Sequence, residues 1–333
     1  MISDRVASNL KAEFRRNLLP KIGLVVLTAI LLMALFAPVL ATHNPNTTGY
    51  FDDGTSYPPM GTTAESYEVV DGERQSIEVE PSSEHLLGTN NVGQDVFSRL
   101  LYGARTSLLV GTLGTGIAVI MGVPFGLISG YFGGRIDDAM MRVADVMLAF
   151  PSLVLALALV GVFGSMTVSI PDPFVAAGLA EGMPSSTPLP GTVTLVVGLV
   201  TWVWFARVAR GEAMAIRNEE YVTAARSLGA SDATILFKHV LPNSLTPVIV
   251  LATIQVASVI LLESSLSFLG FSGTTLSWGY EIQQGQEYLR QNWWISTIPG
   301  VGIVLAVISI NLLGDWLRDS LDPNIEGEGG GAA

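Results

Sequence analysis

Residues 106–132 read TSLLVGTLGTGIAVIMGVPFGLISGYF, an uncharged stretch that is rich in Gly and contains Pro124. A helix needs about 20 apolar residues to cross the roughly 30 Å hydrocarbon core of a bilayer, so this stretch predicts a transmembrane helix. Pro and Gly are tolerated inside such a helix because neighbouring helices satisfy the backbone groups that they free. The stretch therefore places the chain among integral membrane proteins.

The composition of the 333-residue chain indicates the same class. The chain is 49% hydrophobic and 14% charged, with a mean hydropathy of +0.49, whereas soluble domains are typically about 25% charged. The sequence has no Cys, and the wide sequence spacing of His43, His85 and His239 predicts no metal-binding cluster. It also lacks the phosphate-binding G-x-x-x-x-G-K-[ST] pattern. We therefore expect a membrane protein that holds no cofactor or metal and is not an enzyme by itself.

Five further stretches are apolar enough to predict transmembrane helices. They cover residues 22–41, 143–164, 192–205, 246–271 and 295–313. The stretch at 192–205 is the shortest, so we expect its helix to extend at both ends. Together the six stretches predict an all-α integral membrane protein with six transmembrane helices.

Lys and Arg are distributed unevenly among the segments that connect the predicted helices. With the N-terminus inside, the inner segments contain 13 of these residues and the outer segments contain 4. The positive-inside rule therefore predicts a multi-pass protein of the cell membrane with both termini in the cytoplasm. Residues 206–244 would lie inside, and residues 42–105 and 165–191 would form extended loops outside. Asp95, Arg99 and Arg105 precede residue 106, and we expect them to anchor their helix at the membrane interface. Gating of the outer mouth and contact with another protein are the alternatives.

The chain is strongly acidic, with a net charge of −12, which argues against nucleic acid as a partner. Only three of its 17 basic residues are Lys, and residues 42–85 contain nine acidic residues and one Arg. An acidic protein with little Lys is typical of a high-salt (halophilic) source, where ions screen the repulsion between like charges. An acidic outer loop alone explains the same composition, so both interpretations stay open.

Residues 217–247 read RNEEYVTAARSLGASDATILFKHVLPNSLTP and predict two short helices between membrane spans. Gly229 suits the left-handed backbone conformation that ends a helix. Ser231 is a favourable N-cap for the second helix, which we expect to end at Leu241-Pro242. Such a pair of helices can dock into a groove of another protein or lie on the bilayer surface, and the physical pattern does not choose between these alternatives.

The same segment resembles the coupling loop of permease subunits in binding-protein-dependent ABC importers, E-A-A-x-x-x-G followed by I-x-L-P. The matching residues are Thr223, Ala224, Ala225, Gly229, Leu241 and Pro242. Thr223 replaces the usual Glu, and His239 replaces the usual Ile. Residues 85–111, 130–160, 262–272 and 311–323 also resemble the second permease of dipeptide and oligopeptide importers.

This resemblance implies the type-1 ABC importer transmembrane fold over residues 105–322, with the coupling loop at residues 217–242. Residues 1–104 would form the N-terminal tail, the first helix and an acidic outer loop, and residues 323–333 a flexible tail. The implied partners are a homologous permease, two cytoplasmic ATPases that bind ATP and Mg²⁺, and an extracytoplasmic solute-binding protein. The implied solute is a peptide, although related permeases carry nickel chelates, glutathione or oligosaccharides.

One carboxylate, Glu263, lies within the span predicted at residues 246–271. A charge in hydrocarbon is costly, so Glu263 lines a solute pathway, is protonated, or is a structural carboxylate that the nearby Ser264, Ser265 and Ser267 can satisfy by hydrogen bonds. A stand-alone secondary transporter and a channel are the rival functions. The former typically has inverted repeats, which we do not find in the sequence, and for the latter only Glu263 hints at a ring of like charges.

Overall fold

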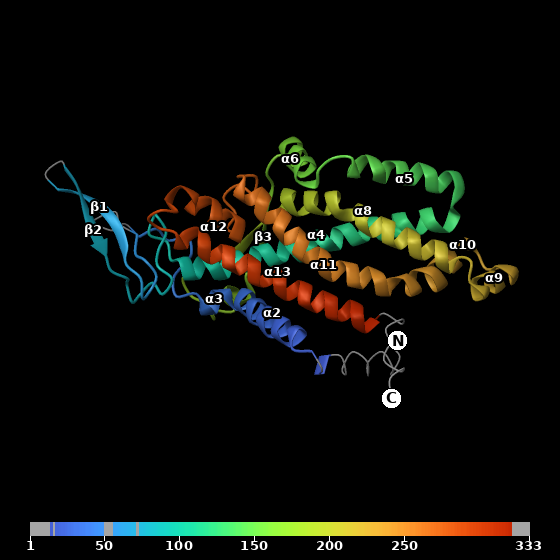
Figure 1. The fold of residues 1–333 in the computed structure, drawn as a ribbon, viewed down its shortest axis with the longest axis horizontal. Helices are drawn as coiled ribbons and strands as arrows, with labels where there is room; N and C mark the ends of the chain where they lie inside the picture. Colours follow the sequence, from blue (N-terminus) through green and yellow to red (C-terminus); the bar gives the residue numbers. More distant parts are fainter. Residues whose placement is uncertain (1–13, 16, 50–55, 71–72, 322–333) are drawn as a thin grey trace, which may run out of the picture.

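Four helices that are long and apolar enough to cross a membrane set the long axis of the molecule (Figure 1). The computed structural model describes residues 14–15, 17–49, 56–70 and 73–321, and the four helices are counted within these ranges. They are α4 (Val96–Phe132), α8 (Gly191–Ile216), α11 (Leu241–Phe268) and α13 (Trp294–Leu321). α4, α8 and α13 each contain a predicted apolar stretch, and α11 covers all but the last three residues of the stretch at 246–271. α8 extends beyond its stretch at both ends, as expected.

The first predicted span is a shorter helix followed by a second, four-residue one. α2 (Leu19–Leu35) has 17 residues, and α3 (Ala37–Leu40) begins after Phe36. At 1.5 Å per residue, α2 is about 25 Å long, which is less than the hydrocarbon thickness. α3 continues the apolar segment beyond this length. α2 packs along α13, where Gly23 lies next to Ser309 and Leu312.

The third predicted span is a bent pair of helices. α5 (Gly134–Leu148) and α6 (Ser152–Phe163) meet at an angle of 90°. The bend lies at Pro151, whose backbone is extended at ψ +130°. Proline also disfavours helical backbone at the residue that precedes it, so the helix ends there. The apolar stretch predicted as a span at residues 143–164 is therefore broken at Pro151 and is not one straight helix.

α4 and α8 lie side by side over much of their length (Figure 1). Gly122, Gly126 and Gly130 are spaced by four residues and face the backbone of α8. A methyl group on any of the three would overlap with a carbonyl oxygen of α8. Small residues at this spacing let membrane helices approach closely, which matters because lipid provides no hydrophobic force that drives helices together.

Short elements cover the end of the molecule opposite to α9 (Glu220–Ser227) in Figure 1, and we call this end the hairpin end. Two antiparallel hairpins lie here, in segments that we predicted as extended loops, so the loop prediction missed the strands. The elements are β1 (Ala64–Val70), β2 (Glu73–Val79), β3 (Thr167–Pro171), α7 (Pro173–Ala176), β4 (Ser186–Pro190), α12 (Trp278–Gly285) and a 3₁₀ turn (Gln286–Tyr288). Ala64 pairs with Val79 at the base of the first hairpin.

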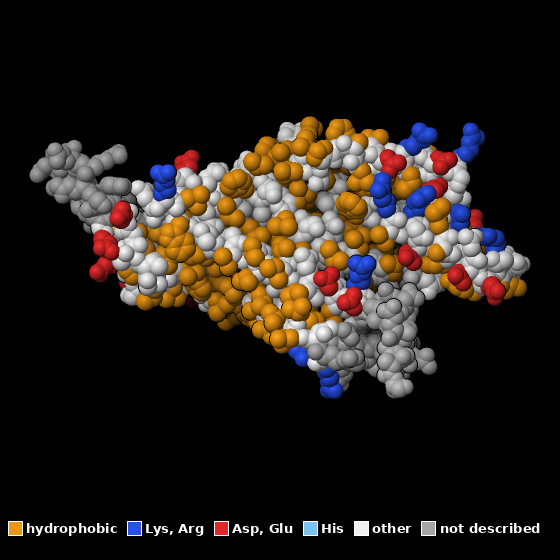
Figure 2. Space-filling view, in the orientation of Figure 1, with side chains coloured by type: hydrophobic (Ala, Val, Ile, Leu, Met, Phe, Trp, Pro, Cys, Tyr) orange, Lys and Arg blue, Asp and Glu red, His pale blue; other side chains and the backbone are white. Residues whose placement is uncertain are grey.

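Charged side chains gather towards the two ends of the face drawn in Figure 2, and hydrophobic side chains dominate the region between them. Ile120, Val162 and Val304 are among the large hydrophobic side chains that the chain leaves exposed. Such a broad apolar surface is typical of a protein that faces lipid or partner subunits rather than water. The distribution agrees with a multi-pass membrane protein.

Candidate functional site

The predicted coupling segment, residues 217–242, protrudes from the end of the molecule opposite to the hairpins (Figure 1). It contains α9 (Glu220–Ser227), α10 (Asp232–Ile235) and a single turn of π-helix (Leu236–Val240), which we call the π-turn. Gly229 lies between α9 and α10 with a φ of +83°. A residue with a side chain adopts this left-handed conformation only at a cost, so glycine lets the chain reverse direction here.

The six residues of the predicted signature do not share one environment. Thr223, Ala224, Gly229 and Pro242 are exposed, whereas Ala225 and Leu241 are half-buried. Thr223, Ala224 and Ala225 lie on the protruding helix, Gly229 lies in the turn that follows it, and Leu241 and Pro242 lie at the start of α11. The structure therefore exposes four of the six residues, and it divides them between the protruding part and the junction with the membrane helices.

Apolar side chains anchor the coupling segment in the core of the molecule. Val222, Ile235 and Val240 are fully buried and belong to one cluster with residues of α4 and α8, including Tyr131 and Ile216. Full burial of such side chains contributes roughly 1.5–3 kcal/mol each. The base of the segment is therefore packed as part of the membrane bundle.

Polar contacts to the end of α4 fix the same segment. The Tyr131 hydroxyl donates to Asp232 Oδ1 (2.6 Å) and accepts from Arg226 Nη2 (3.4 Å), so one side chain contacts both α9 and α10. Arg217 Nη1 donates to the carbonyl oxygen of Gly130 (2.8 Å). The sequence did not point to these contacts, since Tyr131 is about a hundred positions from Arg226 and Asp232 and no local pattern marks it.

The tip of the segment presents hydrophobic side chains that this chain leaves exposed. Leu228 is 89% exposed and Phe237 is 71% exposed. A Cβ atom placed on Gly229 would meet no atom within 4 Å, so the turn has open space around it. An anchored base with an exposed apolar tip is suited to contact another protein, because burying the tip would release its apolar surface from water.

The second helix of the segment does not end where we predicted. Ser231 caps α10 as expected and accepts a hydrogen bond from the Thr234 N–H (3.3 Å). The helix then continues through the π-turn into α11, so the predicted end at Leu241-Pro242 is wrong. The π-turn changes the hydrogen-bond register, and Pro242 falls in the first turn of α11, where its missing N–H is tolerated.

Glu263 lies on α11 at the contact with α4 and is completely buried. Its carboxylate accepts from the hydroxyls of Ser267 (2.6 Å), Ser107 (3.1 Å) and Ser264 (3.4 Å). Ser265 donates to the carbonyl oxygen of Leu261 instead, so the expectation for Ser265 is wrong. Glu263 thus joins two membrane helices through hydroxyl groups, an arrangement that favours the structural interpretation over a pathway-lining one.

Two Arg side chains at the hairpin end form ion pairs, of which that of Arg99 is buried and that of Arg105 is half-buried, so both do more than anchor their helix at the interface. Arg99 makes a bidentate pair with Glu281 of α12, at 2.9 Å and 2.5 Å, and its Nη1 donates to the carbonyl oxygen of Pro45 (2.8 Å). Arg105 pairs with Asp172, which precedes α7. Both Arg residues therefore join α4 to segments that cover this end.

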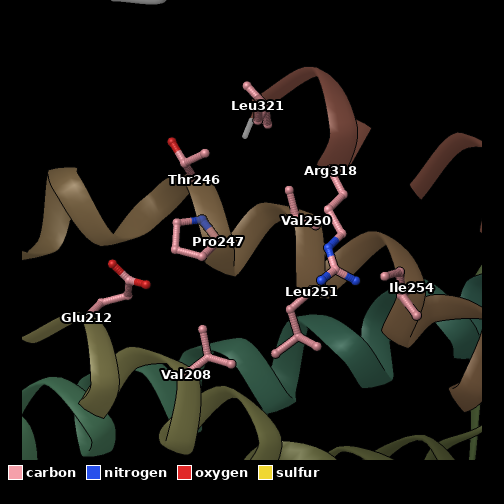
Figure 3. A pocket seen from close by; sticks show the side chains of 9 residues that line it. All are labelled: Val208, Glu212, Thr246, Pro247, Val250, Leu251, Ile254, Arg318 and Leu321. Atoms are coloured by element: carbon pink, nitrogen blue, oxygen red, sulfur yellow. The ribbon is translucent and has the colours of Figure 1, made fainter. Parts of the chain in front are cut away.

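A groove of about 620 Å³ lies between α8, α11 and α13 (Figure 3). Its lining is mainly apolar and includes Pro247, Val250 and Leu251 of α11. Glu212 of α8 and Arg318 of α13 enter it from two sides and bring opposite charges (Figure 3). The groove thus offers a surface that combines apolar contact with one acidic and one basic group.

His43 and His85 lie together at the hairpin end, although they are far apart in the sequence. Their ring centroids are 4.6 Å apart, and His85 Nδ1 lies 3.0 Å from Asp95 Oδ1. The expectation of scattered His side chains is therefore wrong for these two. His239 lies in the π-turn, in the part of the chain that carries the coupling segment.

Comparison with known proteins provides the family. The family described as binding-protein-dependent transport system inner membrane component matches residues 122–327. The N-terminal TM domain of oligopeptide transport permease C matches residues 11–59. The dipeptide transport system permease protein DppC of Alkalihalophilus pseudofirmus is 33% identical over 94% of this chain and 88% of the relative. The probable D,D-dipeptide transport system permease protein DdpC of Escherichia coli is 35% identical over 91% and 87%, respectively.

Among solved structures, the inward-facing MetNI methionine ABC transporter is similar, with a TM-score of 0.51 and 16% sequence identity. The match covers 67% of this chain and 97% of the other, and it supports the fold alone. The family match extends over more than half of the chain, and the relatives are similar along most of their length. The chain therefore belongs to the binding-protein-dependent inner membrane components, the permease subunits of ABC importers, and has the type-1 importer fold.

Proposed function

We propose that this permease forms half of the pathway of an ATP-driven peptide importer, and that residues 217–242 transmit the movement of the ATPases to its membrane helices. Its partners would be a homologous permease, two ATPases that bind ATP and Mg²⁺, and a solute-binding protein. The observation that carries the proposal is the coupling segment, which has an exposed apolar tip and a buried, hydrogen-bonded base.

The contacts of this segment supply a route for coupling. An ATPase that holds the tip at Leu228 and Phe237 would pull on a base that is packed against α4 and α8. Tyr131 joins α9 and α10 to α4, and α10 is continuous with α11. Movement of the tip would therefore displace three membrane helices together and switch the pathway between outward- and inward-facing states.

A peptide is the solute that the relatives favour. Both permeases described above carry dipeptide in their names. The groove between α8, α11 and α13 would border the pathway, where Glu212 and Arg318 suit the ammonium and carboxylate ends of a peptide. Selection of the solute rests largely with the solute-binding protein. The ligand that this partner binds therefore decides between a peptide and the nickel chelates, glutathione or oligosaccharides that related permeases carry.

The same proposal sets the orientation in the cell membrane. The coupling segment must face the cytoplasm to reach the ATPases, and the hairpin end would then face the solute-binding protein outside. The 13-to-4 distribution of Lys and Arg supports this orientation. Both termini would be cytoplasmic.

Substitution of Gly229 tests the coupling role. Gly229→Arg adds a long side chain to an exposed turn with positive φ, without touching a membrane helix. Backbone strain costs on the order of 1 kcal/mol, and the new atoms fill space that the ATPase would occupy. We expect normal insertion, weakened attachment of the ATPases, and loss of ATP-driven peptide uptake in vesicles.

Gly270 provides the matched control. Its φ is +86°, it is exposed, and a Cβ atom there also meets no atom within 4 Å, but it follows the opposite end of α11. Gly270→Arg thus repeats the strain far from the coupling segment and is expected to retain the ATPases during purification. Wild-type attachment and uptake in Gly229→Arg would contradict the proposed coupling role.

A further inference from the structure

Three potential metal ligands from separate segments meet at the hairpin end. His43 follows α3, His85 precedes α4, and Asp95 is the N-cap residue of α4. One ligand atom from each lies within 4.8 Å of the other two. The Nδ1 atoms of His85 and His43 are 3.0 Å and 3.9 Å from the same atom, Asp95 Oδ1.

We propose that His43, His85 and Asp95 bind a divalent transition-metal ion, for which Zn²⁺ is the best match. Two imidazoles and one carboxylate are a common ligand set for zinc, with the fourth position left to water. Metal–ligand distances of about 2.0–2.2 Å in a tetrahedron place ligand atoms roughly 3.3 Å apart. The observed separations bracket this value, so small side-chain rotations bring the three atoms to an ion.

Neighbouring groups hold the carboxylate in an orientation suited to this role. Asp95 Oδ2 accepts from the Ser98 N–H (2.7 Å) and the Thr42 hydroxyl (3.3 Å), which leaves Oδ1 directed at the two imidazoles. The backbone N–H of His43 donates to the Ser98 hydroxyl (3.1 Å). Such contacts around a metal site restrict the ligands and raise affinity, because less ordering is needed when the ion binds.

The site combines a buried acceptor with an accessible side. The Asp95 side chain is fully buried and that of His85 is 13% exposed, whereas that of His43 is 38% exposed and leaves a route from solvent. The exposed carboxylates of Glu80 and Glu84 lie in the segment between His43 and His85, and their negative potential attracts cations. His85 at 3.0 Å also suits a direct hydrogen bond to Asp95, and an ion would replace that bond with coordination by the other tautomer.

An ion at this place would link both ends of the segment that contains β1 and β2 to the start of α4. His43 and His85 flank this segment, and Asp95 begins the membrane helix. A bound ion would therefore hold the segment that contains β1 and β2 against the start of α4. This proposal does not depend on the coupling segment or on the transported solute.

Metal content of the full-length chain in lipid nanodiscs tests the proposal, with a purification tag that contains no His. After dialysis against micromolar Zn²⁺, we expect about one zinc per wild-type chain by mass spectrometry. His43→Gln/His85→Gln and Asp95→Asn should each lower the affinity at least tenfold, and Asn still serves as a helix cap. His239→Gln is the matched control, because it removes the third His of the chain from outside the cluster, and it should bind zinc like the wild type.

X-ray absorption of the zinc-loaded wild type provides a measurement that does not rely on a variant. It should show two imidazole nitrogens and oxygen ligands at about 2.0–2.2 Å. Zinc bound to the double His variant with wild-type affinity would overturn the proposal, as would a spectrum without imidazole ligands. A wild-type chain that retains no zinc after dialysis would overturn it as well.

Discussion

Replacement of Leu228 by Ala is expected to weaken ATPase binding without destabilising the permease. Leu228 is 89% exposed in this chain, so its truncation removes almost no internal packing. In the proposed complex the tip is buried in a groove of the ATPase, and burial of a Leu side chain contributes about 1.5–3 kcal/mol. Loss of that contribution raises the dissociation constant about 10- to 150-fold. Phe237, which is 71% exposed, is expected to behave in the same way.

Ile235 is the matched comparison, because it lies in the same segment but is fully buried. Ile235→Ala leaves a cavity in the core and is expected to lower the free energy of unfolding by about 2–5 kcal/mol. Thermal unfolding in nanodiscs measures stability, and titration with fluorescently labelled ATPase measures docking. Wild-type ATPase affinity in a Leu228→Ala/Phe237→Ala variant would refute the reasoning, as would a fall in its stability as large as that of Ile235→Ala.

Three further outcomes are expected. In intact cells, an impermeant thiol reagent should label Ser83→Cys but not Ser227→Cys in this Cys-free chain, and the reverse pattern would contradict the orientation. Glu281→Gln leaves buried Arg99 without its charge partner and should lower the free energy of unfolding by about 3–5 kcal/mol. Glu287 is exposed, so Glu287→Gln should be as stable as the wild type, and equal stability of the two variants would disprove the role of the pair. If the acidic excess reflects a high-salt source, molar KCl should raise the unfolding temperature above that in dilute buffer, and equal temperatures would exclude this explanation.

The membrane helices illustrate how far sequence patterns reach. Long apolar stretches located α4, α8, α11 and α13, because a helix that crosses hydrocarbon must be apolar along a run of known length. The same argument did not predict the 90° bend at Pro151. Hydropathy averages over a window and is insensitive to direction, so it does not distinguish a straight helix from two helices that meet at an angle.

The coupling segment shows a similar division. Gly229 and Ser231 marked the turn and the second helix start correctly, since helix caps depend on residues within one turn of each other. Leu241-Pro242 misled us about the end of that helix, because Pro at the start of a helix and Pro after its end look alike in sequence. Packing against the bundle and the π-turn settled which applies.

By itself, the sequence determined that this is a multi-pass membrane protein, located most of its helices and placed the glycine turn of the coupling segment. These features depend on local composition and spacing. Only the tertiary structure joined Arg99 to Glu281, Tyr131 to Asp232, and His43 to His85. These partners are between 42 and 182 positions apart, and their contacts arise from how the helices and their covering segments pack, which no local pattern encodes.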